Sequence, residues 1–502
     1  MRKRIIIIVL VVLAAPLFGL LASAIVGARL ATESFAQHAA DTVCDSYGQP
    51  LISDSDDYCY LRSSNSLLWK SSAVLLVFTV LLPSVYAALA YTLGRSGKWL
   101  ARCFPWLVRP TMAALAVLLV FHGLLVLYAG YLLAGALSFL PILTLSSLVW
   151  SVLLGLGFAW VALLILIEAV RRWSVEPVPI VGIALAREQM PELTERVAIL
   201  ASQLDAKPPE RIVVGLEPRA FVTSVPLKLR GQGLLPSAET LYLPTCVLRT
   251  FDEQQLNALI SHELAHFRAG DLAFTVRFAP SLRGLAHAID SVSWDVKPKE
   301  SPGLWSLARL PAGFLIQGIA LVLAWAVNRI RRTREFEADR VAARTSSNFS
   351  FAAAVVKISL LSLLWKRFRT ENAKYLASGR ARINLSTDYL KYFAGALSKA
   401  DRGKLREALL KSRLAHPIDT HPILADRIQA LEVESVAIFD RSVDELLVQE
   451  QGAVGLESLE RAITAIENDW MCIPGTPYVL DREEVSAPGP LAGMSPPTPN
   501  DA

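Results

Sequence analysis

Four long apolar blocks in the first third of the chain limit the folds that this sequence can adopt. Each block is long enough for a helix to cross a hydrocarbon core of about 30 Å, which requires about 20 apolar residues. Hydrophobic residues make up 53% of the chain, and their concentration in blocks is typical of a membrane protein rather than of a large soluble core. The predicted spanning helices are Ile5–Val26, Ser72–Leu93, Met112–Ala134 and Leu143–Ile167.

The first block has two interpretations. It follows a basic start, Arg2–Arg4, and ends near Ala22–Ala24, so a cleaved signal peptide is one alternative. Its apolar stretch is longer than the about 7–15 residues that are typical of signal peptides. An uncleaved membrane anchor is therefore favoured, and both interpretations predict the same topology downstream.

Basic residues flank the blocks on one side of the membrane. The loop from about residue 29 to 71 is acidic instead. Because Lys and Arg are enriched in cytoplasmic loops, we expect this loop outside and both ends of the four-helix region inside. The net charge of +5 mostly reflects these flanking residues and indicates no nucleic-acid-binding surface. The flanking basic residues are Arg2, Lys3, Arg4, Arg95, Lys98, Arg102, Arg109, Arg171 and Arg172.

The cysteines are divided between the two sides of the predicted membrane. Cys44 and Cys59 fall in the outside loop, where an oxidising compartment could join them in a disulfide. Cys103, Cys246 and Cys472 lie in cytoplasmic stretches and are predicted to be free thiols. The sequence has no Cys-x-x-Cys pair, so a cysteine-rich zinc module is excluded.

From residue 171 onward the pattern is that of a folded, water-exposed α+β domain that is mostly helical. Helices are predicted at Pro191–Ala206 and Arg331–Arg344. Thr250–Glu253 has the Ser/Thr-x-x-Glu form of a capping box and is predicted to open another helix. Short β-branched stretches predict strands at Arg211–Leu216, Arg219–Val225 and Glu239–Pro244.

These patterns divide the chain into four regions. Residues 1–170 form the transmembrane region, and residues 171–430 form the folded domain. Residues 431–485 are predicted to be a helical extension. Residues 486–502 are rich in proline and are predicted to be a disordered tail.

The helix after Thr250 carries a His-Glu-x-x-His motif at His262–His266. Residues four apart share a helix face, with Cβ atoms about 5–6 Å apart, so the two imidazoles can bind one Zn²⁺. Glu263 lies beside them, near enough to accept a proton from an attacking water. The alternative is a packing helix with two incidental histidines. The chain has only seven histidines, so the zinc interpretation is favoured.

A catalytic zinc site needs a third protein ligand and an open position. The candidates are Asp271 and two residues of a later charged helix, Glu335 and Asp339. Glu335 and Asp339 share a helix face, so one could bind the metal while the other orients a histidine. A solvated helix face is an equally good interpretation of this charged run, and the residues alone leave the choice open.

The motifs together resemble the HtpX-like family of membrane zinc endopeptidases, which also includes the CAAX prenyl endopeptidases. The resemblance covers roughly residues 192–427 and implies a gluzincin-type metallopeptidase domain with one Zn²⁺ per chain. The motifs that carry it are His262–His266, Gly270-Asp271, Glu335–Asp339 and Thr420-His421-Pro422 with Arg427.

The resemblance implies a role for each of these side chains. His262, His266 and Glu335 would be the metal ligands, and Glu263 would be the general base. His421 would approach the reacting carbonyl and help to hold the oxyanion.

Three further residues would support this site. Asp339 would support a metal ligand, Asp271 would brace the end of the helix, and Arg427 would pack behind His421.

A substrate-pairing strand is also implied by the resemblance, at Ala220, Phe221 and Val222. The family often has Asn-Ala-Phe at this point, whereas this chain has Arg219-Ala220-Phe221.

Residues 272–330 form an apolar, membrane-associated insert between the ligands. Because His262 and Glu335 must meet at one ion, this insert cannot cross the membrane an odd number of times. Gly313–Asn328 is nearly long enough to span, but its possible partner Leu272–Ile289 contains Arg277, Pro280 and Arg283. The alternatives are a membrane hairpin and a shallow, surface-docked segment, and the second is slightly favoured.

The sequence therefore predicts an ATP-independent zinc endopeptidase of a bacterial-type inner membrane, acting on proteins at the cytoplasmic face. The family suggests membrane-protein quality control, and prenyl-protein processing is a weaker expectation. The chain has no phosphate-binding Gly-x-x-x-x-Gly-Lys-Ser/Thr loop, so no ATP is expected. A catalytically inactive membrane scaffold or signalling subunit is the alternative from another class. For His122, inside the third span, a functional role is one interpretation, and a packed or hydrogen-bonded histidine is at least as well supported. The oligomeric state is left open.

Overall fold

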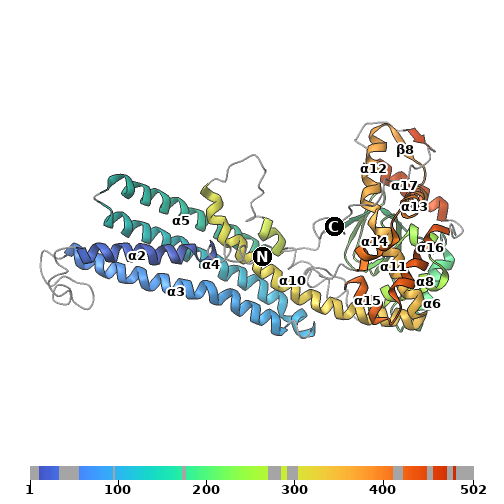
Figure 1. Ribbon diagram of the computed structural model, residues 1–502, viewed down its shortest axis with the longest axis horizontal. Helices are drawn as coiled ribbons and strands as arrows, with labels where there is room; N and C mark the ends of the chain where they lie inside the picture. Colours follow the sequence, from blue (N-terminus) through green and yellow to red (C-terminus); the bar gives the residue numbers. More distant parts are fainter. Residues whose placement is uncertain are drawn as a thin grey trace. The chain divides into compact units, whose positions relative to one another are not determined.

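The chain divides into two compact units, each built from two separate segments. The first unit comprises Met1–Trp173 and Phe278–Ala326, and the second comprises Ser174–Arg277 and Val327–Ala502. Figure 1 shows the computed structural model, coloured along the chain. The residues that it describes are 11–32, 56–93, 97–138, 140–171, 177–268, 284–290, 304–410, 422–448, 456–471 and 479–481.

The first unit contains the four helices that the apolar blocks predict. Each is long and apolar enough to cross a membrane, and α3 and α4 extend well beyond their predicted spans. The described part of the predicted span Ile5–Val26 is helical, and its first residues lie outside the described part. The helices are α2 (Ala14–Thr32), α3 (Asp56–Leu93), α4 (Gly97–Ala136) and α5 (Pro141–Val170).

Small residues allow α4 and α5 to pack closely. A Cβ atom added at Gly130 would overlap the Oγ of Ser151, which shows how near the two backbones approach. Without a strong hydrophobic force between helices in lipid, such close packing is a main source of helix association. On the neighbouring helix α3, Thr79 Oγ1 lies 3.2 Å from Nε2 of buried His122, whose Nδ1 lies 2.8 Å from the carbonyl oxygen of Leu118. These contacts favour the packed, hydrogen-bonded interpretation of His122.

A fifth long helix, α10 (Leu304–Thr345), joins the first unit through its apolar half. Its stretch Arg309–Thr345 is also long and apolar enough to span, and Trp325 stacks on Tyr91 of α3 with ring centroids 5.5 Å apart. The apolar half of α10 therefore packs within the first unit. Most of its expected partner, Leu272–Ile289, lies outside the described residues, so the choice between a membrane hairpin and a surface-docked segment stays a prediction.

A sixth apolar stretch, Asn348–Ala377, satisfies the same criteria of length and composition. It covers α11 (Asn348–Leu363) and α12 (Trp365–Ala377). Phe351 and Lys357 of α11 are fully buried, and α11 belongs to the largest hydrophobic core of the second unit. We therefore assign this stretch to the core of the folded domain.

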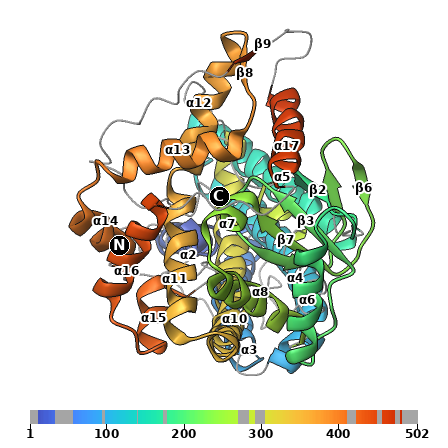
Figure 2. The ribbon, with the colours of Figure 1, turned by 90° about the vertical axis from the view of Figure 1, so that its right-hand side faces the viewer.

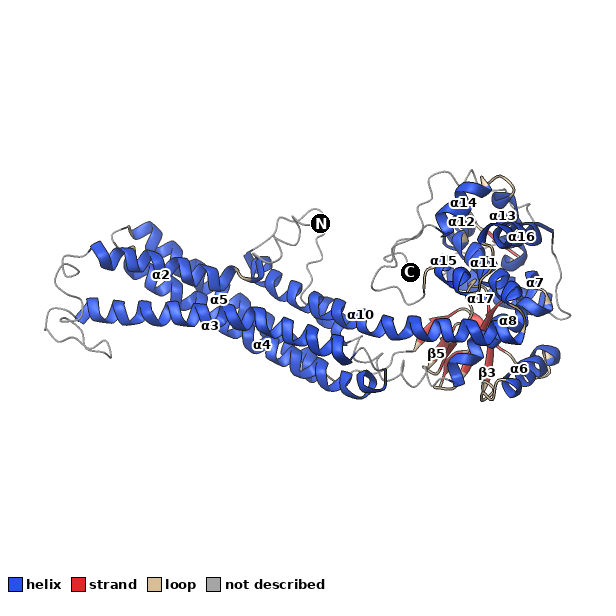
Figure 3. Cartoon of the chain, turned by 60° about the horizontal axis from the view of Figure 1, so that its bottom comes forward, coloured by secondary structure: helices blue, strands red, loops and turns tan. Residues whose placement is uncertain are grey.

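The strands that the structure describes all lie in the second unit, and Figure 3 draws them in red. A four-stranded sheet has the order β2-β3-β7-β4, with β3 parallel to β7 and β4 antiparallel to β7 at the edge. A second sheet has the order β1-β5-β6, and β8 pairs with β9. The strands are β1 (Val178–Ile180), β2 (Gly182–Ala184), β3 (Arg211–Gly215), β4 (Phe221–Thr223), β5 (Leu227–Leu229), β6 (Gly233–Leu235), β7 (Thr240–Pro244), β8 (Arg380–Arg382) and β9 (Val479–Asp481).

The three predicted strands correspond to β3, β4 and β7, and the predicted helices correspond to α6, α8 and the last part of α10. Figure 2 shows α8 between the sheet and α11. The predicted C-terminal extension supplies α16, α17 and β9, and its side chains join the same hydrophobic core. The remaining helices of this unit are α6 (Pro191–Gln203), α7 (Thr245–Thr250), α8 (Glu253–Arg268), α13 (Leu385–Leu397), α14 (Arg402–Leu410), α15 (Leu424–Ala430), α16 (Ser435–Val448) and α17 (Leu456–Met471).

The start of α8 differs from the predicted capping box. Asp252 Oδ1 accepts a hydrogen bond from the Gln255 backbone N–H at 2.8 Å, and Gln255 Oε1 accepts from the Asp252 N–H at 3.4 Å. The reciprocal cap is therefore Asp252 with Gln255, and the expected pair Thr250–Glu253 is wrong. The hydroxyl of Thr250 instead donates to the Cys246 carbonyl and helps to close α7.

Two further expectations concern the cysteines and the tail. Cys59 is disulfide-bonded, while Cys103 and Cys246 are free thiols, as expected. The proposed partner Cys44, the thiol Cys472 and the tail 486–502 lie outside the described residues.

Candidate metal centre

Helix α8 brings two imidazole rings of the motif to one place. His262 and His266 are one helical turn apart, with ring centroids 5.1 Å apart and ring planes at 89°. Both side chains are largely shielded, with His262 only 5% exposed. A buried helix face that presents two ring nitrogens is half of a metal site.

Glu335 of α10 completes a cluster of three potential ligands. Its Oε2 lies 3.6 Å from His262 Nε2, and its Oε1 lies 3.6 Å from His266 Nε2. One atom from each of the three residues lies within 4.8 Å of the others. Nitrogen and oxygen ligands at about 2.0–2.1 Å from a tetrahedral ion would be about 3.3–3.4 Å apart. The donor types and the spacing therefore fit a Zn²⁺ ion with one position left open.

Asp339 lies behind His262, one turn along α10 from Glu335. Its Oδ1 is 3.1 Å from His262 Nδ1, so the carboxylate holds the ring with Nε2 directed to Glu335. A carboxylate that contacts the second ring nitrogen fixes the orientation and tautomer of a ligating histidine. The structure thus distinguishes the two acidic residues: Glu335 lies at the ligand position, and Asp339 lies at the supporting position.

Arg427 of α15 holds Asp339 in turn. Its Nε and Nη2 donate to the two oxygens of Asp339 at 2.9 and 2.6 Å, which is a bidentate pair. The family resemblance implied only that Arg427 packs behind His421, and nothing in the sequence indicated this pairing. The structure instead shows a chain of contacts from Arg427 through Asp339 to His262.

The electrostatics of this cluster favour a cation. Burial by itself lowers the pKa of His262, but the neighbouring carboxylates of Asp339 and Glu335 outweigh burial and raise the pKa to about 9. Burial also lowers the pKa of Arg427, and Asp339, Glu335 and Glu263 more than compensate, so that its pKa is raised. Both shifts show that the buried carboxylates create a negative environment at the ring nitrogens.

Glu263 is buried beside the cluster, as the motif requires of a general base, with 6% of its surface exposed. Glu337, by contrast, is exposed, whereas Glu335 and Asp339 are buried. The expected common face of Glu335 and Asp339 is therefore confirmed, and Glu337 points away from it.

Phe351 of α11 is a site residue that the sequence did not indicate. Its ring stacks on His262 with centroids 5.5 Å apart and an angle of 24°, and the Arg427 guanidinium lies 5.8 Å from the same ring. In the sequence it is one apolar residue of an apolar helix, so no local signal distinguishes it. The Phe351 ring packs on the face of the His262 ring, while Asp339 contacts the ring edge at Nδ1.

Strand β4, the expected substrate strand, forms one edge of the four-stranded sheet. Ala220 and Val222 pack against the core that contains α8, while Phe221 faces the other side and stacks on Tyr242 at 4.7 Å. Among the described strands, β4 pairs only with β7, so its outer edge has backbone groups available for another strand.

Two of the expected site residues, Asp271 and His421, lie outside the described residues. Of the other expected residues, the structure brings together His262, Glu263, His266, Glu335, Asp339 and Arg427.

Comparison with known proteins agrees with this geometry. Residues 187–435 match the family model of Peptidase family M48. The chain is 24% identical to a Protease HtpX homolog of Archaeoglobus fulgidus over 268 residues, which cover 52% of this chain and 72% of that protein. It is 30% identical to a Protease HtpX homolog of Acidiphilium cryptum over 171 residues, which cover 34% of this chain and 56% of that protein. A Protease HtpX homolog of Chlorobium phaeovibrioides is 27% identical over 214 residues, which cover 39% of this chain and 66% of that protein.

A peptidase domain joined to apolar helices that can span a bilayer defines the class of this chain, which is a membrane-associated protease. More narrowly, the domain belongs to peptidase family M48, a family of zinc metalloproteases, and the chain is HtpX-like at modest identity.

Proposed function

We propose that this chain is an ATP-independent zinc endopeptidase that hydrolyses protein substrates at the cytoplasmic face of the plasma membrane. The observation that carries the proposal is the buried cluster of His262, His266 and Glu335, with Glu263 beside it. Its donor set and spacing match a three-ligand catalytic site.

Each residue of the metal centre would have a separate role in peptide hydrolysis. A bound Zn²⁺ would supply Lewis-acid polarisation of the scissile carbonyl and make a water more acidic. Glu263 would accept the proton of the attacking water and return it to the leaving amine. Asp339 and Arg427 would keep His262 in the orientation that directs Nε2 to the metal position.

Substrate binding is proposed along the outer edge of β4. An extended peptide can add to an exposed sheet edge through main-chain hydrogen bonds, with alternate side chains pointing to opposite faces. Ala220, Phe221 and Val222 would pair with substrate here, which places the peptide beside α8 because Val222 packs against the same core as that helix. We also propose that His421 helps to hold the oxyanion and that Asp271 braces the end of α8.

The cellular role follows from the membrane helices and the flanking basic residues. Positively charged segments after α5 favour a cytoplasmic peptidase domain. Quality control or processing of membrane proteins is the proposed role, since a tethered protease meets substrates at the bilayer surface. The relatives are aligned over 56–72% of their own length, so this role is proposed for the whole chain rather than transferred from them.

The alternative is an inactive scaffold that keeps the peptidase fold. Glu263→Gln separates the two, because it removes the base while leaving His262, His266 and Glu335 in place. Purified full-length protein should bind one zinc per chain and cleave casein, and the variant should keep the zinc but lose cleavage. Wild-type protein that binds zinc and yet cleaves nothing, or a variant that remains active, would overturn the proposal.

A further inference from the structure

A cavity of about 560 Å³ lies between α5 and α10 within the first unit. Leu156, Trp160 and Leu163 follow one face of α5 and form its apolar wall, and Arg309 of α10 lines it as well. The volume falls within the range of about 300–1,000 Å³ that is typical of small-molecule sites. The α5 side chains are about half exposed, so the cavity opens toward the surroundings of the helix.

The position of the cavity along α5 places it near a membrane interface. At about 1.5 Å per residue, a helix of 30 residues is about 45 Å long, which exceeds a hydrocarbon core of about 30 Å. If both ends of α5 project equally, Trp160 and Leu163 lie within about 10 Å of the hydrocarbon boundary at its C-terminal end. Tryptophan is enriched at this depth.

Among the residues that the structure describes, Arg309 is the one charged residue of the cavity wall. The residues that the structure describes provide no hydrogen bond or ion pair to its side chain. Two other arginines of the first unit have partners within it: Arg171 lies 3.2 Å from Glu168, and Arg109 of α4 donates to the Arg171 carbonyl at 3.4 Å. A guanidinium beside an apolar wall in a membrane requires an anion or access to the interface.

We propose that this cavity binds one anionic phospholipid, with an acyl chain along the α5 wall and the phosphate at Arg309. The guanidinium suits a phosphate because its planar donors can form two parallel hydrogen bonds. The wall of Leu156, Trp160 and Leu163 suits an acyl chain because it is apolar and opens to the bilayer. A lipid satisfies both halves of the cavity at the depth where its head and chain meet.

The test measures lipid binding to the full-length protein and does not depend on catalysis. Protein in a nonionic detergent is titrated with phosphatidylglycerol or with phosphatidylcholine, and bound lipids are counted by native mass spectrometry. The wild type should bind the first phosphatidylglycerol about tenfold more tightly than phosphatidylcholine, since the charge-assisted contact is absent from the neutral headgroup. Arg309→Gln should remove that preference, and Arg309→Lys should retain part of it.

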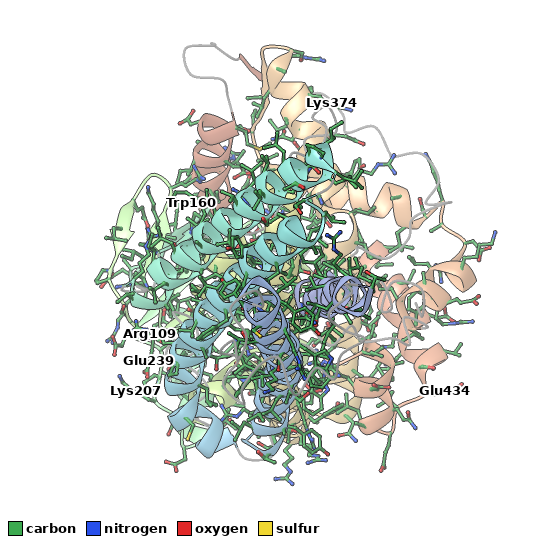
Figure 4. The ribbon with its side chains drawn as sticks, turned by 90° about the vertical axis from the view of Figure 1, so that its left-hand side faces the viewer. Arg109, Trp160, Lys207, Glu239, Lys374 and Glu434 are labelled. Atoms are coloured by element: carbon green, nitrogen blue, oxygen red, sulfur yellow. The ribbon has the colours of Figure 1, made fainter. Side chains whose placement is uncertain are left out.

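Two further variants test the two halves of the cavity separately. Ala159→Trp fills the wall without a change of charge, and it should weaken the first binding event for both lipids. Arg109→Gln is the matched control: it removes an arginine from α4 that does not line the cavity, and binding should be unchanged. Figure 4 shows Arg109 on α4 and Trp160 on α5 at separate places.

Several outcomes would overturn the proposal. Equal losses in the Arg309→Gln and Arg109→Gln variants would show a general effect of surface charge. Unchanged lipid binding in Arg309→Gln, accompanied by weaker cross-linking of an acidic membrane-protein substrate, would assign the cavity to substrate instead. Displacement of phosphatidylglycerol by millimolar inorganic phosphate would indicate an anion site without an acyl-chain site.

Discussion

Two clusters of buried charged residues lie in the second unit, and they differ in where their positive charge comes from. The metal centre holds Glu263, Glu335 and Asp339 against the single guanidinium of Arg427. Three carboxylates minus one guanidinium leave two negative charges when the histidines are neutral. That excess matches the charge of a divalent cation.

The other cluster contains its own cation. Lys357 is fully buried, and its Nζ lies 2.7 Å from Glu445 Oε2 and 2.8 Å from Gln255 Oε1. Arg441 donates to the same glutamate at 2.7 Å, and Gln255 donates to it at 2.8 Å. We call Lys357, Glu445, Gln255 and Arg441 the lysine cluster.

The comparison teaches how a buried polar cluster can be assigned to binding or to structure. In the lysine cluster, the Lys357 ammonium and the Glu445 carboxylate compensate each other's charge, so the cluster needs no bound ion. In the metal centre, the negative charges converge on two ring nitrogens, and among the described residues no lysine forms an ion pair with the cluster. A buried charge needs compensation, and only the metal centre must obtain it from outside the chain.

Removal of the third ligand should break the metal centre most severely. Glu335→Ala leaves only two protein ligands, so zinc content and cleavage should both fall by more than the about 10–100-fold typical of losing a supporting partner. Metal analysis of purified protein, together with a casein cleavage assay, measures both. A Glu335→Ala variant that retains stoichiometric zinc would exclude Glu335 as a ligand.

Removal of the support behind His262 should have a smaller effect. Asp339→Ala leaves all three ligands in place but frees the His262 ring and leaves Arg427 without its carboxylate. Zinc affinity should fall by about 10–100-fold, while metal at saturating concentration should restore part of the cleavage. Chelator competition measures the affinity, and lack of any rescue by added zinc would argue that Asp339 does more than orient the ring.

The lysine cluster should respond in stability rather than in metal binding. Glu445→Gln leaves the fully buried ammonium of Lys357 without its counter-charge, which should cost about 2–4 kcal/mol at pH 7. Thermal melting should show this loss, and zinc content of the folded protein should be unchanged. Glu457→Gln, which breaks an exposed pair with Arg461, is the control and should cost less than about 1 kcal/mol.

The same variant has a defined dependence on pH. Burial raises the pKa of Glu445, but hydrogen bonds from Lys357, Arg441 and Gln255 outweigh it and lower the pKa to about 2. A depressed pKa contributes stability that is present above the unfolded value of about 4.3 and is lost as pH falls toward 2. The difference in melting temperature between the wild type and Glu445→Gln should therefore be constant near neutral pH and shrink below about pH 4. A difference that grows on acidification would contradict the ionised state of Glu445.

The parts of this molecule that the sequence predicted are those set by local geometry. The spacing of His262 and His266 fixes their common face because one helical turn separates them, and the apolar blocks fix the spans by length. The cap of α8 was misplaced by two residues because the Thr250 hydroxyl donates to the Cys246 carbonyl of its own helix, and Asp252 supplies the oxygen that accepts from the first turn of α8.

The parts that the sequence could not predict depend on contacts between distant segments. Nothing near Arg427 indicates that it binds Asp339, and nothing near Phe351 indicates that it stacks on His262. Lys357 lies in an apolar helix, and only the tertiary fold shows its partner Glu445 on α16. Only the family resemblance selected Glu335 as the third ligand. Its residue type and its position on a charged helix fit a solvent-exposed helix face equally well.

The smallest expected effect is at Glu337, which lies between the two functional acidic residues of α10. A helix turns about 100° per residue, so Glu337 points away from the face that carries Glu335 and Asp339, and its side chain is exposed. Glu337→Ala removes the same carboxylate as Glu335→Ala, two residues along, and it should leave zinc content and cleavage within about twofold of the wild type, because exposed substitutions rarely perturb a fold. Measured side by side, the two alanine variants separate loss of a ligand from loss of acidic charge on α10. A Glu337→Ala variant without zinc beside a zinc-loaded Glu335→Ala variant would mean that the helix presents its opposite face to His262.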